Sequence, residues 1–307
     1  MQLNLPSPIE NIQHPLFEKY GLEVWMKRDD LIHPEISGNK WRKLKLNIEK
    51  FKSYKYDKIL TFGGAYSNHI AATACIGSEM GIPTIGMIRG EELSKNSNET
   101  LEQAAQYGMQ LEFVSRSEYQ YRYEKWHWEN LRSKYGNCLI IPEGGANILG
   151  VLGCAEIVSE LDFEPDYIFC AAGTGTTISG LLLNVLKTIV VAVPVFKNGH
   201  FIKDEVKTLL SEVGLLEDDL NDKMNQLELA TDYHFGGYGK YNEELISFMN
   251  VFYNQTKIKL DQIYTGKMVY AFFEMIKAGK FKPGSKIVLL HTGGIQGISS
   301  IKDKLIY

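Results

Sequence analysis

The chain has 307 residues, 44% of them hydrophobic and 23% charged, with a formal net charge of −4. This composition is typical of a globular protein, and the length allows one large core or two modest domains. The sequence has no basic block of the kind that nucleic-acid-binding proteins usually carry, so we expect no nucleic-acid partner. Its longest apolar run, Ile189 to Phe196, is too short to cross a bilayer, so we expect no membrane partner.

Short apolar runs alternate with helical patterns from about residue 58 onward. The pattern predicts strands at residues 58–62, 83–88, 111–114, 138–141, 167–170, 189–196 and 286–290. Between them it predicts helices at 67–81, 98–108, 118–135, 150–161 and 176–186. This alternation favours an α/β fold with a doubly wound, mostly parallel sheet, and the near-continuous apolar strands indicate burial on both faces.

Glycine turns follow four of the predicted strands. In open α/β sheets, ligands bind at the carboxyl ends of the strands, so four such turns predict one small-molecule site built from distant segments. The turns are Gly63-Gly64, Gly144-Gly145, Gly173-x-Gly175 and Gly293-Gly294.

The third turn, Gly173-Thr174-Gly175-Thr176-Thr177, lies between a strand and a helix. Backbone N–H groups at a helix N-terminus, with threonine hydroxyls beside them, can bind an anion. The loop lacks the lysine of a P-loop, the third glycine of a dinucleotide site and a ribose-binding acid on the next strand. It therefore suits an isolated phosphate, although a plain tight turn explains the same residues.

Lys40 follows a Gly-Asn turn in the segment SGNKWRKLK, preceded by Lys27-Arg-Asp-Asp30. A lysine that opens a helix and faces a cleft loses its proton more readily when buried, because desolvation disfavours the ammonium. The neutral amine can then form a Schiff base. A solvated basic helix start is the alternative interpretation, and it is the commoner one for a lysine-rich stretch.

Further polar candidates follow the first glycine turn or lie beside other glycines. Ser67, Asn68 and His69 come after the first turn, where Ser67 can also be a simple N-cap. Tyr238 and Tyr264 each lie beside glycines, although a lone tyrosine is more often a packing residue. The sequence contains no His-Glu-x-x-His and no Gly-x-Ser-x-Gly elbow with a plausible triad, which disfavours zinc and serine hydrolases.

The four cysteines, Cys75, Cys138, Cys154 and Cys170, show neither Cys-x-x-Cys nor zinc-ligand spacing with histidine. We therefore expect no metal and interpret the cysteines as buried thiols in a reducing compartment. The first residues lack a basic segment followed by an apolar run, so we expect no signal peptide and a cytoplasmic location.

Taken in order, these segments resemble the 1-aminocyclopropane-1-carboxylate (ACC) deaminase/D-cysteine desulfhydrase family. This family belongs to the tryptophan-synthase-β-like (fold type II) enzymes, which use pyridoxal 5'-phosphate (PLP). The resemblance runs from about Lys27 to Gly294, and KRDDL followed by GNKWRKL is its most specific part.

The resemblance implies a role for each candidate residue. Lys40 would hold PLP as a Schiff base, Asn68 would bond the phenolic oxygen of the cofactor, and Thr292 would lie near its pyridine nitrogen. The loop Gly173 to Thr177 would bind the phosphate. Ser67 and the adjoining loop would hold the substrate carboxylate, with His69 where many members have glutamine, and the family's two active-site tyrosines would be Tyr238 and Tyr264.

The resemblance also implies two domains and a homodimer. The larger, PLP-binding domain would comprise residues 1–47 and 147–307, and a small inserted α/β domain would comprise residues 48–146. The chain is shorter than is usual for the family between Leu186 and Ile189.

The family contains two main reactions on small amino acids. In ACC deaminases the site tyrosine is typically followed by glutamate, and the His-x-Gly-Gly segment typically contains leucine. This chain has Thr265 and Thr292 there, which favours D-cysteine β-elimination and places Thr265 among the substrate-binding residues. ACC deamination, a non-catalytic PLP- or metabolite-binding protein and a nicotinamide dehydrogenase stay open as alternatives, the last disfavoured by the missing ribose-binding acid.

Overall fold

The computed structural model describes residues 1–36 and 38–307 and contains two compact units. Unit 1 comprises residues 1–3, 33–36 and 40–153, and unit 2 comprises residues 4–32, 38–39 and 154–307. The division differs from the expected inserted domain, residues 48–146. The helix at Lys40–Ser53 packs on other helices of unit 1, so residues 40–47 belong to that unit.

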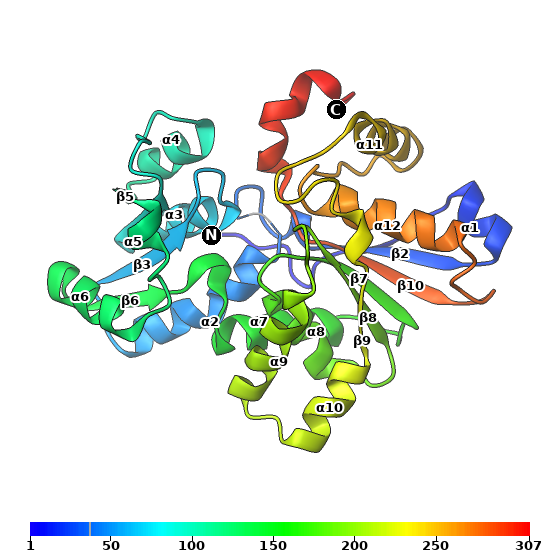
Figure 1. Ribbon diagram of the computed structural model, residues 1–307, viewed down its shortest axis with the longest axis horizontal. Helices are drawn as coiled ribbons and strands as arrows, with labels where there is room; N and C mark the ends of the chain where they lie inside the picture. The colour runs from blue at the N-terminus through cyan, green and yellow to red at the C-terminus, as the bar shows by residue number, and fades with distance from the viewer. Residues whose placement is uncertain (37) are drawn as a thin grey trace. The chain divides into compact units, whose positions relative to one another are not determined.

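Unit 1 is built on a four-stranded parallel sheet in the order β5-β4-β3-β6 (Figure 1). Its strands are β3 (Lys58–Gly63), β4 (Thr84–Arg89), β5 (Gln110–Val114) and β6 (Cys138–Ile141). Its helical segments are α2 (Lys40–Ser53), α3 (Asn68–Met80), α4 (Glu99–Gln106), α5 (Arg116–Tyr119), α6 (Lys125–Tyr135) and η2 (Glu143–Gly145).

Alternate residues of β4 point to opposite faces of this sheet, and each face is covered. Ile88 packs with Ile70 of α3 and Leu101 of α4. Met87, on the other face, belongs to the cluster that contains Leu131 of α6. The expected burial of both faces is therefore confirmed for this strand.

The predicted helix at 118–135 is wrong as a single element, because residues 120–124 separate α5 from α6. Arg122 lies in this break. Its guanidinium pairs with Glu143 at 2.6 Å, and its carbonyl accepts a hydrogen bond from the Trp128 indole at 2.7 Å. These contacts stabilise the interruption, and the helical periodicity of the sequence does not reveal them.

Unit 2 contains a six-stranded sheet in the order β1-β2-β10-β7-β8-β9, in which β1 pairs antiparallel with β2 and the other neighbours are parallel. The strands are β1 (Ile9–Asn11), β2 (Glu23–Arg28), β7 (Tyr167–Ala172), β8 (Ile189–Pro194), β9 (Leu227–Leu229) and β10 (Lys286–His291). The sequence pattern did not reveal β1, β2 or β9.

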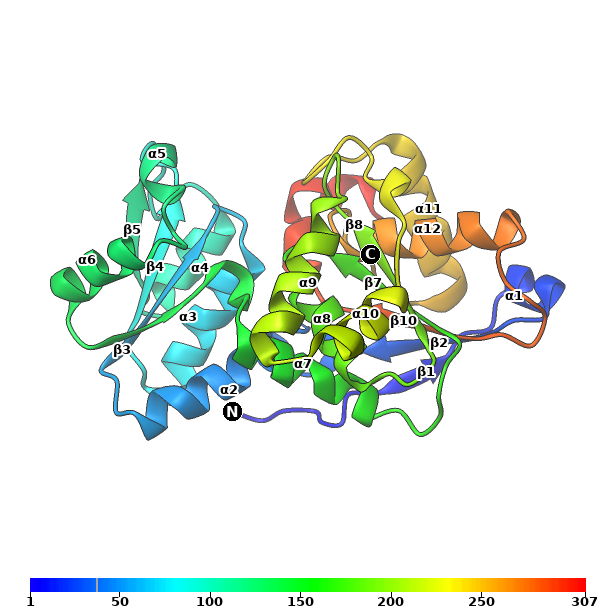
Figure 2. The ribbon, with the colours of Figure 1, turned by 60° about the horizontal axis from the view of Figure 1, so that its bottom comes forward.

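Helices cover both faces of this sheet (Figures 1 and 2). One face packs on α1 (Pro15–Tyr20), α11 (Glu243–Thr256) and α12 (Thr265–Lys277). The other packs on α7 (Ile148–Ser159), α8 (Thr176–Asn184), α9 (Phe201–Val213) and α10 (Glu217–Asn225). The short helices η1 (Asp29–Leu31), η3 (Thr231–Tyr233) and η4 (Ile295–Lys304) complete the described elements, and α7 crosses the division between the units.

The short connection between α8 and β8 is held in place by side chains. The Lys223 ammonium donates to the carbonyl of Val185 at 2.6 Å, and the Thr188 hydroxyl donates to the carbonyl of Pro165 at 2.6 Å. These bonds anchor the connection, with α8 ending at Asn184 and the strand beginning five residues later, at Ile189.

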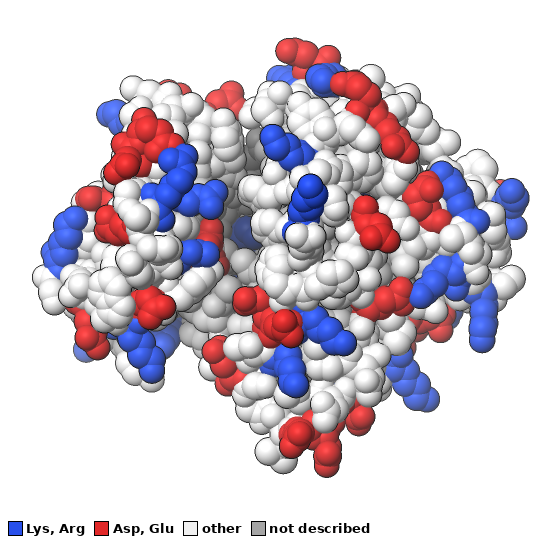
Figure 3. All heavy atoms as spheres, in the orientation of Figure 1, with Lys and Arg blue, Asp and Glu red and all other residues white. Residues whose placement is uncertain are grey.

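Among the described residues, no helix combines the length and the apolar character that crossing a membrane requires. On the face drawn in Figure 3, lysine and arginine side chains are interspersed with aspartate and glutamate. The near balance of 33 basic and 37 acidic residues accounts for this mixture.

The parallel pairing positions the candidate loops. Strands β7 and β10 are neighbours, so the glycine loop after Ala172 and the turn after His291 leave the sheet at the same edge. This is the carboxyl edge, where ligands of open α/β sheets bind.

Candidate active site

The phosphate-type loop of unit 2 connects β7 to α8. Gly175 is the N-cap of α8 and has φ +73°, a conformation that glycine adopts without strain. Thr176 and Thr177 form the first helical turn, where backbone N–H groups have no partner within the helix. The hydroxyl oxygens of Thr174 and Thr176 lie 2.9 Å apart. The loop therefore presents N–H and hydroxyl donors together, as an anion site requires.

Asn39 links this loop to the end of β10. Its side-chain amide donates to the Thr177 hydroxyl oxygen at 2.8 Å, and its backbone N–H donates to the carbonyl of Thr292 at 3.2 Å. Gly38 has φ +54°, and a Cβ there would lie 1.8 Å from the same carbonyl oxygen. The backbone immediately before Lys40 is therefore held against both loops. The sequence interpretation assigned Asn39 no role.

The two predicted tyrosines meet in unit 2. Their hydroxyl oxygens are 3.5 Å apart, with Tyr264 donating to Tyr238. Tyr238 stacks on Phe196 at a centroid distance of 5.4 Å, and a Cβ at Gly173 would lie 3.5 Å from the ring of Tyr264. The structure thus brings Tyr238, Tyr264 and the phosphate-type loop together.

Asp261 fixes the segment that carries Tyr264. Its carboxylate accepts hydrogen bonds from the backbone N–H groups of Ile263, Tyr264 and Thr265 at 2.8–2.9 Å. The Thr265 hydroxyl also donates to it, at 2.7 Å, and Thr265 is fully buried. A structural partner therefore already engages the hydroxyl of Thr265, and the proposed contact of this residue with substrate stays a prediction. Sequence reasoning missed Asp261, although an aspartate before a helix start is a recognisable capping signal.

In unit 1, Ser67 and Asn68 begin α3 at the carboxyl end of β3. The Ser67 hydroxyl oxygen accepts a hydrogen bond from the N–H of Ile70 at 3.3 Å, so the expected N-cap is confirmed. The hydroxyl proton is not used in that bond. Both residues are half-buried, and a Cβ at Gly63 would lie only 2.7 Å from the Ser67 oxygen, so this turn requires glycine.

His69 is buried, and its tautomer follows from its contacts. The Thr61 hydroxyl donates to the carbonyl of Ile141 at 2.8 Å, so it can only accept from the Nε2–H of His69, which lies 2.8 Å away. Nδ1 of His69 therefore carries the lone pair and has no hydrogen-bond partner among the residues that the structure describes. Burial, then the charges of Lys40 and Lys43, lower the pKa of His69 well below its usual value, so the ring is neutral near pH 7.

Lys40 is the first residue of α2 and is half-buried. Its effect on His69 shows that the two side chains, predicted from separate motifs, belong to one electrostatic neighbourhood in unit 1. Ser37 of the same motif lies outside the described residues.

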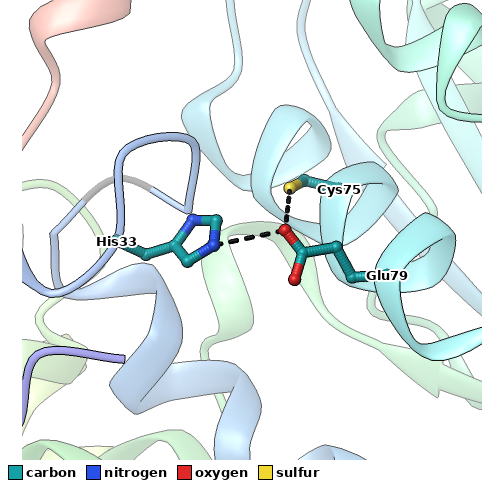
Figure 4. Close-up of side chains that lie close together, drawn as sticks. All are labelled: His33, Cys75 and Glu79. Carbon is teal, nitrogen blue, oxygen red and sulfur yellow. Dashed lines mark hydrogen bonds and ion pairs between the residues drawn. The ribbon is translucent and has the colours of Figure 1, made fainter. Parts of the chain in front are cut away.

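A second polar cluster in unit 1 contains His33, Cys75 and Glu79 (Figure 4), whose potential ligand atoms lie within 4.8 Å of one another. Nδ1 of His33 accepts the backbone N–H groups of Glu35 and Ile36, both at 3.1 Å, so Nε2 carries the proton and points to Glu79 at 3.2 Å. Burial raises the pKa of the Cys75 thiol to about 11. A protonated Nε2 and a protonated thiol suit a hydrogen-bonded cluster better than a metal site.

The site residues fit a cofactor that has a phosphate and a reactive carbonyl. The donors of the α8 N-terminus suit the phosphate, and the close approach of Gly38 to Thr292 fixes the chain just before the amine of Lys40. Within unit 2, the tyrosine pair adds hydroxyl groups near the same loop.

Comparison with known proteins agrees with this chemistry. Residues 2–293 match the family described as pyridoxal-phosphate dependent enzyme. A Pyrococcus horikoshii protein named putative 1-aminocyclopropane-1-carboxylate deaminase is 30% identical over 98% of this chain and 93% of its own length. An Arabidopsis thaliana protein named bifunctional D-cysteine desulfhydrase/1-aminocyclopropane-1-carboxylate deaminase, mitochondrial, is 30% identical over 98% of this chain and 79% of its own length.

A solved structure described as an ACC deaminase homologue superposes with a TM-score of 0.83 at 28% identity, covering 100% of this chain and 94% of the other. The fold is therefore that of the fold type II enzymes, as expected. The chain belongs to the family of pyridoxal-phosphate dependent enzymes.

Proposed function

We propose that this enzyme is a lyase that cleaves D-cysteine by β-elimination. D-Cysteine and water would give pyruvate, hydrogen sulfide and ammonia. The observation that best supports a PLP site is the position of Asn39, hydrogen-bonded to Thr177 and Thr292 and covalently joined to Lys40. This arrangement links the amine that would hold the cofactor to the loop that would hold its phosphate.

The protein's own residues would bind and orient the reactants. PLP supplies an electron sink that stabilises negative charge at the α-carbon of a bound amino acid. Lys40 would hold the cofactor and, when released, is one candidate to accept the α-proton. The hydroxyl proton of Ser67, which its bond with Ile70 does not use, suits a substrate carboxylate, and Asn68 follows it at the same helix start. Tyr238 and Tyr264 would hold a proton near the leaving group.

The choice of D-cysteine depends on Thr265 and Thr292. A carboxylate near the pyridine nitrogen stabilises a protonated ring, whereas a threonine offers a neutral hydrogen bond and leaves a weaker electron sink. β-Elimination starts from an acidic α-proton and releases a good thiolate leaving group, so a weaker sink suffices. Neither position carries a carboxylate, which favours this reaction.

ACC deamination, which gives 2-oxobutanoate and ammonia, is the second candidate. The name of the Pyrococcus horikoshii relative supports it. ACC lacks an α-proton, so its ring must be opened by attack or proton removal at the ring carbons, with help from a tyrosine. The hydroxyl pair of Tyr238 and Tyr264 is compatible with that role.

One preparation can separate these reactions. Pyruvate and sulfide from D-cysteine are measured beside 2-oxobutanoate from ACC, with L-cysteine as a stereochemical control. We expect D-cysteine turnover to exceed ACC turnover. Efficient ACC turnover without sulfide release would reverse the assignment. PLP binding without turnover of any small amino acid would favour a non-catalytic binding protein.

We also propose a homodimer in the cytoplasm, because the family resemblance implies the first and the cysteine usage suggests the second. Light scattering on the purified PLP-bound protein would test the dimer. Fractionation of the native cells would test the location.

A further inference from the structure

Lys267 is a buried lysine in the first turn of α12, three residues after Tyr264. Its ammonium donates to the carbonyls of His234 and Gly237, each at 2.8 Å. These two carbonyls belong to the loop that presents Tyr238. Lys267 therefore connects the helix that begins beside one active-site tyrosine to the loop that carries the other.

The loop needs such an anchor because its backbone is unusual. Phe235, Gly236, Gly237 and Gly239 have φ values of +51°, +95°, +116° and +69°. They lie outside the described helices and strands, so no regular ladder of hydrogen bonds fixes them. Glycine-rich backbone of this kind loses much conformational freedom when it is ordered, and the loop position of Tyr238 depends on the contacts that restrain it.

The same two carbonyls also accept the backbone hydrogen bonds that form the turns of this loop. The carbonyl of His234 also accepts the N–H of Gly237 at 3.0 Å, and the carbonyl of Gly237 accepts the N–H of Lys240 at 3.1 Å. Lys267 thus donates to the remaining lone pair of each carbonyl. Its ammonium joins two consecutive turns, and Tyr238 lies within the second.

Keeping a lysine here carries an electrostatic cost. The ammonium lies near the positive end of the α12 dipole, and burial lowers the pKa of Lys267 to about 8, opposed by the charge of Asp261. The carboxylate of Asp261 holds Tyr264 through its backbone N–H at 2.8 Å. The segment 261–267 therefore contains the anchors of both tyrosines.

We propose that Lys267 is a positioning residue that holds the Tyr238 loop by two carbonyl contacts and so fixes the hydroxyl of Tyr238 against that of Tyr264. The inference rests on the proposed function, in which these tyrosines act on the substrate. In this proposal Lys267 acts through Tyr238, by its contacts with the carbonyls of His234 and Gly237.

A double-mutant cycle tests the proposal. Lys267→Met should lower kcat for D-cysteine by about tenfold, or about 1.4 kcal/mol, with a smaller change in KM. In a Tyr238→Phe background, the same substitution should change kcat less than about twofold, because the hydroxyl being positioned is already absent. Lys277→Met, at an exposed position of the same helix, is the matched control and should leave kcat unchanged.

Two further measurements keep the result interpretable. Lys267→Gln retains an uncharged N–H donor and should keep more of kcat than the methionine variant, even if the latter folds poorly. Hydrogen exchange of residues 234–240 should be faster in Lys267→Met than in the wild type, whether or not any amino acid is turned over. Faster exchange confined to this loop supports the proposal.

Different results would contradict the positioning role of Lys267 and the proposed function of the enzyme. A wild-type kcat in Lys267→Met, independent effects in the double variant or unchanged exchange of the loop would overturn the positioning role while PLP activity persisted. A wild-type enzyme without activity on D-cysteine or ACC would instead overturn the proposed function. The exchange experiment would then still decide whether Lys267 holds the loop.

Discussion

The side-chain amide of Asn39 donates a hydrogen bond to the hydroxyl of Thr177 over 2.8 Å, between residues 138 positions apart in the sequence. The contact joins the residue before Lys40 to the first turn of α8. The lysine and the phosphate-type loop are expected to hold the same cofactor. Removing either partner of this hydrogen bond should therefore weaken PLP binding.

Asn39→Ala should weaken PLP binding. Losing one buried hydrogen bond costs about 1 kcal/mol, so we expect the Kd for PLP to rise about fivefold. Thr177→Val should have a similar effect, and the two should not add. Absorbance titration of the apoenzyme with PLP measures this. Asn184→Ala, which removes a contact with the carbonyl of Ala155 at the other end of α8, is the control and should bind PLP normally.

Gly38→Ala should be more damaging than an ordinary glycine substitution. Gly81 has a similar φ, +64°, and a Cβ there meets nothing within 4 Å, so Gly81→Ala reports the backbone strain alone, about 1–2 kcal/mol. At Gly38 the added Cβ would also lie 1.8 Å from the carbonyl oxygen of Thr292. Urea denaturation of both variants measures the difference, and equal losses would mean that the close contact is unimportant.

Gly173 allows the charge in the phosphate-type loop to be tested cleanly. An added Cβ at this position makes an ordinary 3.5 Å contact with Tyr264, whereas Gly175 has a positive φ and a tighter 3.1 Å contact with Val206. We expect Gly173→Asp to weaken PLP binding by more than about tenfold, because its carboxylate repels the phosphate. Gly173→Ala should bind nearly as well as wild type. Equal affinities of the two variants would place the phosphate elsewhere.

His69 should make the fold sensitive to acid. Because its pKa is lowered in the folded state, the unfolded chain binds a proton that the folded chain does not once the pH falls below about 6.5. The contribution of His69 to the free energy of unfolding is therefore fully present above that pH, and it is lost as the pH falls toward the lower pKa of the folded state. His69→Gln should lose less stability between about pH 7.5 and about pH 5.5 than wild type, in denaturation measured at both pH values. An exposed histidine, His200, provides the control substitution and should behave like wild type. Parallel pH dependence of wild type and His69→Gln would contradict the assignment.

Local sequence patterns predicted much of the parallel core because its strands are short apolar runs, four of them followed by a glycine turn. Strand β3 and helix α3 follow this rule closely, with Ser67 capping the helix. The edge strand β1 has only three residues and was not predicted from the pattern. The break at Arg122 was also missed, since it depends on partners elsewhere in the chain.

In the candidate site, too, residues in recognisable local motifs were predicted, whereas residues whose partners are distant in sequence were not. Lys40, Ser67 and the loop at Gly173 lie in recognisable turns, and the family resemblance assigned their expected roles. Asn39 and Lys267 were missed because their importance comes from carbonyls and hydroxyls that are distant in sequence. A polar side chain beside a glycine turn does not reveal which backbone group it will meet after folding.

The central claim is that Lys40 holds PLP, and borohydride reduction tests it most directly. The purified protein is reduced in the presence of PLP, digested and mapped by mass spectrometry, with Lys40→Ala as the control. We expect the cofactor to be fixed to the peptide that contains Lys40 in the wild type and no specific label in the variant. A specific label on another lysine, or a wild-type protein that takes up no PLP, would contradict the account.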